Sequence, residues 1–133
     1  EADLQNVDRT VRNPNMLYWQ KELWLIDNGA SLYFHHNWEK REQYILNPFV
    51  QIKDHVLLPY ANNLTEANKF CKEQINADAI HDIVNTIPEA WLQWDEGVTP
   101  QEIKDFYIQY LVERKSQSHY FLKEAQNAKE TLI

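Results

Sequence analysis

The sequence predicts a mainly α-helical (α+β) domain that begins with a short β-hairpin. Two apolar, partly aromatic runs at residues 16–19 and 23–26 are separated by three polar residues, which is a hairpin spacing. From residue 60 onward, apolar residues recur three and four positions apart, as they do along one face of a helix. A length of 133 residues suits one domain, 1–133, with residues 60–133 as its helical body.

The first 30 residues contain the predicted hairpin and the polar turns at its ends. The run at residues 23–26 is continuously apolar, so we expect this strand to be buried on both faces. Gly29 follows soon afterwards and is expected to supply the backbone freedom for a turn after Asp27.

Polar side chains flank the hairpin at a spacing that suits phosphoryl transfer. Asp8 and Asn13 precede it, five positions apart, and Asp27 follows it. Mg²⁺ prefers oxygen ligands and is usually held by one or two carboxylates together with substrate phosphates. Asp27 can supply a carboxylate and Asn13 an amide oxygen, while Asp8 can accept the proton of an attacking hydroxyl.

These motifs resemble the HipA-like kinase family, which is related in fold to phosphatidylinositol kinases and more distantly to protein kinases. The segments that carry the resemblance are NVDRT (residues 6–10), NPN (13–15) and LWLIDNG (23–29), and the match extends through Pro59. The resemblance implies that Asp8 is the catalytic base, and that Asn13 and Asp27 bind Mg²⁺ and, through it, ATP. Asn28 stands where protein kinases have Phe, so a Phe-driven switch has no basis here.

The resemblance also implies a kinase C-terminal lobe without its N-terminal lobe. The chain has two glycines, Gly29 and Gly97, and therefore no Gly-rich phosphate loop. We expect the N-terminal kinase lobe to belong to a larger parent protein, and this chain alone to be inactive. Asn6, Arg9 and His55 are further residues expected near the site.

Composition favours some classes of partner over others. A net charge of −7 argues against general nucleic-acid binding, and no basic run suggests a membrane surface. The single cysteine, Cys71, leaves no internal disulfide and fits a reducing, cytoplasmic setting. No apolar stretch approaches the ~20 residues that span a bilayer.

Two other functions remain open at this point. Asp and Asn are common turn residues, so the chain can instead be a non-catalytic helical protein-interaction domain. A metal-dependent hydrolase is a more distant alternative, because it would need more carboxylates or histidines around Asp27. The acceptor substrate, a protein or small-molecule hydroxyl, is not indicated.

The histidines are not predicted to bind metal. His35 and His36 are adjacent, so their side chains point in different directions, and we expect one to pack and the other to be solvated. We expect His55 to be buried and bonded to a neighbouring group.

The middle of the chain predicts two helices and a short turn. Thr65 is the expected N-cap of the first, whose Ala67, Phe70 and Cys71 share a face, with Cys71 in the core. Asp78 is expected to cap the second. On the second helix we expect Ile80, Ile83 and Val84 to face inward and His81 to face solvent. Beyond it, Trp91 and Trp94 are expected to cover one side of the domain.

The last helical segment has the clearest start signal. Thr99, Pro100 and Glu102 form an N-cap, a first-position proline and a capping-box glutamate. The apolar spacing weakens at residues 115–118, where we expect a bend, and the polar tail at residues 123–129 is expected to fray. The positions expected on the packed face are Ile103, Phe106, Tyr107, Tyr110, Leu111, Arg114, Phe121 and Leu122.

Overall fold

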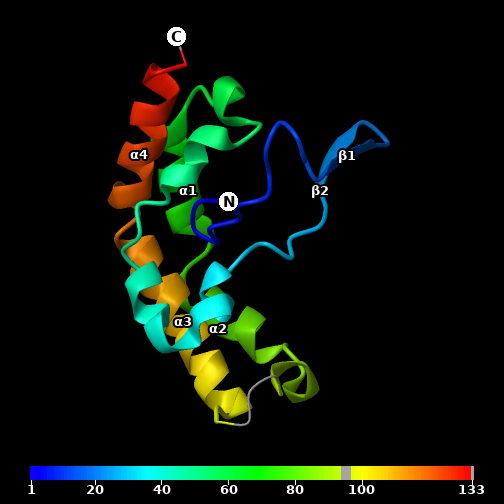
Figure 1. Ribbon diagram of the computed structural model, residues 1–133, viewed down its shortest axis with the longest axis vertical. Helices are drawn as coiled ribbons and strands as arrows, with labels where there is room; N and C mark the ends of the chain where they lie inside the picture. Colours follow the sequence, from blue (N-terminus) through cyan, green and yellow to red (C-terminus); the bar gives the residue numbers. More distant parts are fainter. Residues whose placement is uncertain (94–96, 133) are drawn as a thin grey trace.

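The computed structural model describes residues 1–93 and 97–132 and has a helical body from which a β-hairpin projects (Figure 1). The predicted fold class, mainly α with a short N-terminal hairpin, is confirmed. None of the helices in the described residues has the length and apolar character that crossing a bilayer requires.

The hairpin pairs β1 (Met16–Trp19) with β2 (Glu22–Leu25) in antiparallel register, with Met16 opposite Leu25. Gln20 and Lys21 form its turn, both with positive φ (50° and 68°), as a two-residue turn that matches strand twist requires. The connection is therefore one residue shorter than expected. Ile26 lies beyond the strand, but its N–H still donates to the Asn15 carbonyl at 2.9 Å.

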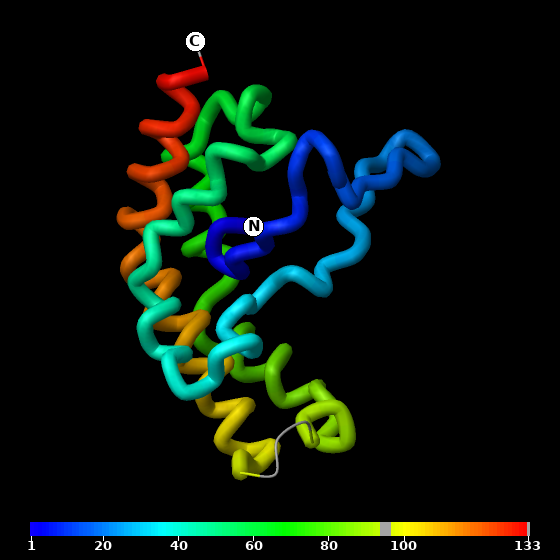
Figure 2. Tube along the Cα trace, in the orientation of Figure 1, coloured from blue at the N-terminus to red at the C-terminus, as the bar shows by residue number. Residues whose placement is uncertain are grey.

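The prediction that the second strand is buried on both faces is wrong. Trp24 is 50% exposed and Leu23 53%, and on the first strand Tyr18 is 71% exposed. Both faces of the hairpin carry apolar side chains, and the hairpin extends away from the helices (Figures 1 and 2). Continuous apolarity predicts a strand with two apolar faces, but it does not show whether this chain supplies the layers to cover them.

The larger core forms around α3 (Pro100–Ser116), which packs against α2 (Ala77–Asn85) and η4 (Glu89–Leu92). The predicted capping box is confirmed: Thr99 accepts from the Glu102 N–H, and the Glu102 carboxylate accepts from the Thr99 N–H at 2.8 Å. The buried side chains of this core are Phe34, Ile45, Ile80, Val84, Leu92, Ile103, Phe106, Tyr107 and Tyr110.

A second core lies along α4 (His119–Glu130), which packs against α1 (Leu64–Gln74), η2 (Val50–Asp54) and η3 (Leu58–Tyr60). The expected bend is confirmed, because α3 ends at Ser116 and α4 begins at His119. The expected fraying of the tail is wrong. Ala125 and Ala128 are buried against Phe49, Ile52 and Leu58. The sequence pattern missed this packed face because its inward residues are small alanines and not large apolar side chains.

Several details of α1 and α2 differ from expectation. Asn63 and Asn76, not Thr65 and Asp78, are the N-caps. No residue of α1 is buried, so placing Cys71 in the core was wrong. On α2 the inward residues are Ile80 and Val84, whereas Ile83 is 61% exposed. His81 faces solvent as predicted.

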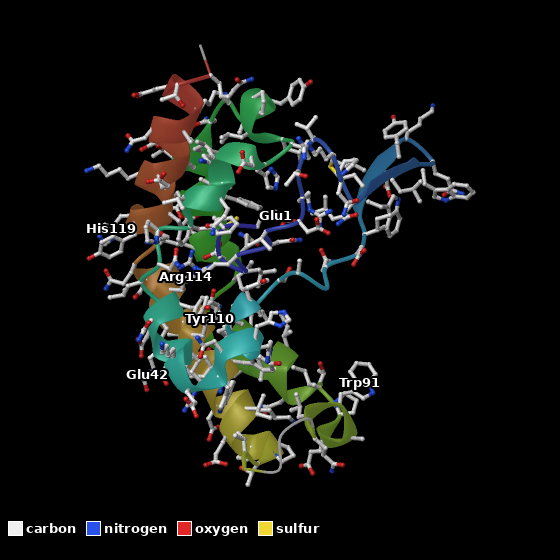
Figure 3. All side chains as sticks on the ribbon, viewed as in Figure 1. Glu1, Glu42, Trp91, Tyr110, Arg114 and His119 are labelled. Carbon is white, nitrogen blue, oxygen red and sulfur yellow. The ribbon has the colours of Figure 1, made fainter. Side chains whose placement is uncertain are left out.

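Helical structure begins well before residue 60. The segment η1 (Tyr33–Tyr44) is a 3₁₀-type run interrupted at Asn37, and η2 and η3 follow it. The predicted turn at residues 89–92 is confirmed as η4. Its Trp91 is 76% exposed and lies at the edge of the molecule (Figure 3), while the expected partner Trp94 falls outside the described residues.

The two adjacent histidines differ as expected, one packed and one solvated. His35 is half-buried, stacks near Trp38, and shares a 2.8 Å hydrogen bond between its Nε2 and the Tyr107 hydroxyl, whereas His36 is exposed. Burial, reinforced by the neighbouring His36, lowers the pKa of His35, and burial raises the pKa of Tyr107 to about 12. The pair is therefore uncharged at neutral pH.

The buried guanidinium of Arg114 joins the N-terminal segment to the helical body, near Tyr110 in Figure 3. It is 1% exposed and packs over the Phe121 ring at 4.9 Å. Its N–H groups donate to the carbonyls of Ala2 (2.7 and 3.1 Å), Tyr44 (3.2 Å), Ile45 (3.0 Å) and Asn47 (2.7 Å). One side chain thus supplies hydrogen-bond donors to the backbone carbonyls of two segments that are distant in sequence.

Replacing Arg114 with methionine should destabilise the protein strongly. The variant keeps most of the side-chain volume but leaves buried carbonyls without donors, at a cost of about 3 kcal/mol or more. Urea unfolding followed by circular dichroism measures the change, with the exposed Lys123→Met as control. Equal stability of the two variants would show that these hydrogen bonds contribute little.

The lowered pKa of His35 predicts a pH dependence of stability. Because its pKa is lower in the folded than in the unfolded state, stability should be complete above about pH 6.5 and decline as the pH falls through the folded-state pKa. A His35→Gln variant should show a flatter decline in thermal midpoint between about pH 7.5 and 5.5 than wild type or the exposed His81→Gln control. Parallel curves for all three would contradict this role.

Candidate functional site

A tight turn at residues 10–13 places the polar residues ahead of the hairpin in one loop. The Thr10 N–H donates to the Asn13 carbonyl at 3.1 Å, and the Asn13 N–H donates to Thr10 Oγ1 at 3.3 Å. Upstream, Asn6 is buried and its Oδ1 accepts from the Asp8 N–H at 3.1 Å. These bonds fix the backbone on both sides of Asp8 and turn the chain back toward it.

The turn brings Asn13 directly onto Asp8. The Asp8 Oδ2 accepts from Asn13 Nδ2 at 2.7 Å and from Asn15 Nδ2 at 3.2 Å. An ionised carboxylate can only accept, so the Asn13 amide must turn its nitrogen toward Asp8. Its Oδ1 is then directed away from Asp8.

Arg9 lies beneath this loop and joins the two ends of the hairpin. Its guanidinium is 1% exposed. One nitrogen, Nη1, donates to carbonyls before β1, those of Pro14 (3.4 Å) and Asn15, and to the Ile26 carbonyl after β2 (3.3 Å). The hairpin base is therefore closed around a single nitrogen atom.

The other nitrogens of Arg9 extend this connection. Nη2 donates to Asn28 Oδ1 at 2.6 Å, and Nε pairs with the Glu1 carboxylate at 2.9 Å. Arg9 thus contacts residues on both sides of Asp27 and the residue that follows Asn13. In this way it holds the turn that carries Asp27 at the same end of the hairpin as the loop that carries Asn13.

Asp27 itself adopts a left-handed backbone conformation with φ of 50° and is exposed. The expectation that Gly29 supplies the backbone freedom for this turn is wrong. Among the described residues no glycine has positive φ, and the left-handed position is Asp27. A Cβ built on Gly29 would lie 3.5 Å from Asp27 Oδ1, an ordinary contact, so space does not require glycine there. Asp tolerates the left-handed region better than most residues, which explains how the turn forms.

The structure therefore brings the predicted site residues together to different degrees. Asp8 and Asn13 are hydrogen-bonded, whereas Asp27 lies between two residues that bond to Arg9. Within the described ranges, no hydrogen bond joins Asp27 to either of the other two. Asn6 acts by fixing the backbone of Asp8.

His55 lies next to this loop without contacting Asp8. The backbone of His55 pairs with that of Thr10 in an isolated β-bridge, and the Val56 N–H donates to the Arg9 carbonyl at 3.0 Å. The ring bonds to a neighbouring group, as expected, because Nδ1 accepts from the Leu57 N–H at 3.1 Å. Burial lowers the pKa of His55, which favours the neutral ring.

The Asp27 carboxylate and the Asn13 amide are oxygen donors of the kind that hard divalent cations prefer. No group of three or more His, Cys, Asp or Glu side chains capable of holding a metal occurs in the described part of the chain. One carboxylate, Asp27, and one amide oxygen, Asn13, are too few to retain Mg²⁺ alone, but they match a site completed by substrate phosphates and water.

Sequence reasoning missed the central role of Arg9 and the contributions of Asn15 and Asn28. Arg9 was expected only to be near the site, yet its hydrogen bonds define it. The one signal in the sequence is the position of Arg9 next to Asp8 in a segment rich in asparagine. This position does not by itself indicate that the Arg9 side chain is buried. The partners of Arg9 lie up to 19 positions away.

Comparisons with protein-family models, curated proteins and solved structures found no match to this chain.

An Arg9→Met variant should loosen the hairpin base while leaving the helical body folded. Without the guanidinium, the carbonyls of Asn15 and Ile26 lose a shared donor and the two ends of the hairpin can separate. Amide hydrogen exchange at Ile26 should accelerate by about tenfold or more, since ~1.4 kcal/mol corresponds to a factor of ten.

Two references make this experiment decisive. Exchange at Tyr110, in the centre of α3, should change little in Arg9→Met. The exposed Arg12→Met should behave as wild type at both positions. Unchanged exchange at Ile26 in Arg9→Met would show that the hairpin base does not depend on this side chain.

Proposed function

We propose that this chain is the catalytic C-terminal lobe of an ATP- and Mg²⁺-dependent, HipA-like phosphotransferase. The observation that carries the proposal is the arrangement around Arg9: a carboxylate–amide pair, Asp8 and Asn13, and a second carboxylate, Asp27, are held at one end of a hairpin. Phosphoryl transfer needs mainly positioned charge and metal ligands, and this arrangement supplies both.

Each residue has a distinct role in this proposal. Asp8 accepts the proton of the acceptor hydroxyl, and its hydrogen bond from Asn13 fixes the carboxylate for that task. Asn13 Oδ1 and the Asp27 carboxylate hold Mg²⁺, which when bound neutralises charge on the phosphates of ATP. Arg9 positions these groups from below without contacting substrate.

The nucleotide-covering part of such an enzyme would come from an N-terminal lobe of the parent protein. A chain with only two glycines cannot form a Gly-rich phosphate loop. The exposed apolar side chains of the hairpin, including Trp19 and Trp24, offer a surface that such a lobe would cover. On this proposal the 133-residue chain alone is inactive, and the single Cys71 suits a cytoplasmic location.

A non-catalytic interaction domain is the second candidate, and the same exposed hairpin favours it. Large apolar side chains on both faces of a projecting hairpin are typical of a protein-binding surface. On this reading Asp8, Asn13 and Asp27 only stabilise turns. The two candidates differ in whether a divalent cation binds between Asn13 and Asp27.

Titrating the chain with Mn²⁺, as a paramagnetic substitute for Mg²⁺, in the presence of a non-hydrolysable ATP analogue that supplies the phosphate ligands tests this difference. The amide signals of Asn13 and Asp27 should broaden first in nuclear magnetic resonance spectra, and an Asp27→Asn variant should lose this effect. The exposed Asp54→Asn should keep it. Broadening confined to other acidic residues would contradict the phosphotransferase proposal and favour the interaction domain.

Activity should be tested in the intact parent protein. Asp8→Asn should lower the rate of phosphoryl transfer by about 10²-fold or more, since a general base contributes this much, while Mn²⁺ binding persists. Asp27→Asn should abolish both. Phosphoryl transfer retained in both variants would refute the assigned roles.

A further inference from the structure

The turn after β2 contains an Asn–Gly pair, Asn28 and Gly29, whose glycine the fold does not explain. Gly29 does not adopt positive φ, and a Cβ built on it would make only an ordinary 3.5 Å contact with Asp27 Oδ1. No other asparagine in the sequence is followed by glycine. What the pair does offer is a chemical property, because a residue without a Cβ leaves its backbone nitrogen open to the preceding side chain.

The groups that would react are accessible and unengaged. Asn28 and Gly29 are both exposed, so hydroxide and water can reach them. The Gly29 N–H makes no hydrogen bond within the described part of the chain, so no partner has to be displaced before it loses its proton. Among residues 1–93 and 97–132, Nδ2 of Asn28 also has no hydrogen-bond partner, so its departure breaks no contact.

The guanidinium of Arg9 contacts the atom on which charge would develop. Its Nη2 donates to Asn28 Oδ1 at 2.6 Å, and the Arg9 side chain is buried. When a nucleophile adds to Asn28 Cγ, negative charge accumulates on Oδ1. A cationic donor already in place stabilises this charge, as the donors of an oxyanion hole do.

We propose that Asn28 is a site of spontaneous deamidation that Arg9 activates. The Gly29 N–H loses its proton to hydroxide, the nitrogen bonds to Asn28 Cγ, and the Cγ–Nδ2 bond breaks as Nδ2 takes up a proton and leaves as ammonia. The product is a cyclic succinimide. Water then adds to one of its two carbonyls: opening at Cγ gives aspartate, and opening at the backbone carbonyl gives isoaspartate.

The activation by Arg9 should outweigh the restraint that the fold places on this turn. Fixing the backbone of one residue slows a step by about 5- to 30-fold, whereas one oxyanion donor accelerates acyl transfer by about 10²-fold or more. We therefore expect Asn28 to deamidate in the folded chain at least as fast as in an unfolded peptide.

The modification would change the turn that carries Asp27. Aspartate at position 28 would pair with Arg9 through a charge-assisted hydrogen bond. Isoaspartate would add a carbon atom to the backbone and move the carboxylate away from Arg9. The inference rests on the contact between Arg9 and Asn28 and does not depend on the proposed function.

Incubating the full chain at mildly alkaline pH, with trypsin digestion and mass spectrometry, measures the rate. The fragment 22–40, released by cleavage after Lys21 and Lys40, contains Asn28 and also Asn37, which precedes Trp38 and serves as an internal reference. The mass increase of an amide-to-acid conversion should appear at Asn28 before Asn37, and at least as fast as in a synthetic peptide of residues 22–40. Conversion that is slower in the folded chain than in the peptide, or faster at Asn37, would overturn the proposal.

Three variants test the groups separately. Gly29→Ala places a Cβ beside the attacking nitrogen, where the fold tolerates it, and the conversion should be lost over the same incubation. Arg9→Met should convert no faster than the peptide, because the donor to Oδ1 is removed. Ser31→Ala, in the same turn, should convert as wild type does. A wild-type rate in Gly29→Ala, or a rate above that of the peptide in Arg9→Met, would refute the role assigned to that residue.

Discussion

The buried guanidinium of Arg9 is the interaction on which the N-terminal part of this structure depends. Its nitrogens bond to backbone carbonyls before β1 and after β2, to the side chain of Asn28 and to the Glu1 carboxylate. A buried charge is tolerated only when it is fully hydrogen-bonded, so the loop, the hairpin base and the following turn must adopt this geometry together. The planar fork of arginine makes this possible, whereas lysine offers no such set of directions.

A second buried arginine, Arg114, performs a similar task in the helical body. It connects α3 to the backbone at residues 44–47 and to the chain near Ala2. The N-terminal segment is therefore held at two points, by Arg114 at one end and through Arg9 at the other. The hairpin is held at its base by Arg9, while large apolar side chains on its two strands remain exposed.

The parts of the fold that local sequence determines could be predicted, and those that depend on distant partners could not. The hairpin, the capping box at Thr99 and the break between α3 and α4 are set by neighbouring residues, and each was predicted. The exposure of the hairpin, the burial of Ala125 and the exposed position of Cys71 depend on which elements pack together. Periodicity records the pattern of apolar residues but not the presence of a partner surface.

The candidate site shows the same division. The spacing of Asp8 and Asn13 identified two residues that the structure joins by a hydrogen bond, because the turn at residues 10–13 brings Asn13 back to Asp8. The position of Asp27 relative to this pair depends on Arg9, whose partners lie far along the chain. No sequence pattern shows where a buried arginine directs its hydrogen bonds.

On the proposed function, Arg9 holds Asn13 and Asp27 closely enough to share one divalent ion. A crystal structure of the chain grown with Mn²⁺ and a non-hydrolysable ATP analogue, with anomalous scattering recorded, measures this directly. We predict a manganese peak about 2.2 Å from both Asn13 Oδ1 and the Asp27 carboxylate, close to the distances of hard-cation sites. A peak bound by neither residue, or side chains of Asn13 and Asp27 pointing to opposite sides of the hairpin, would contradict it.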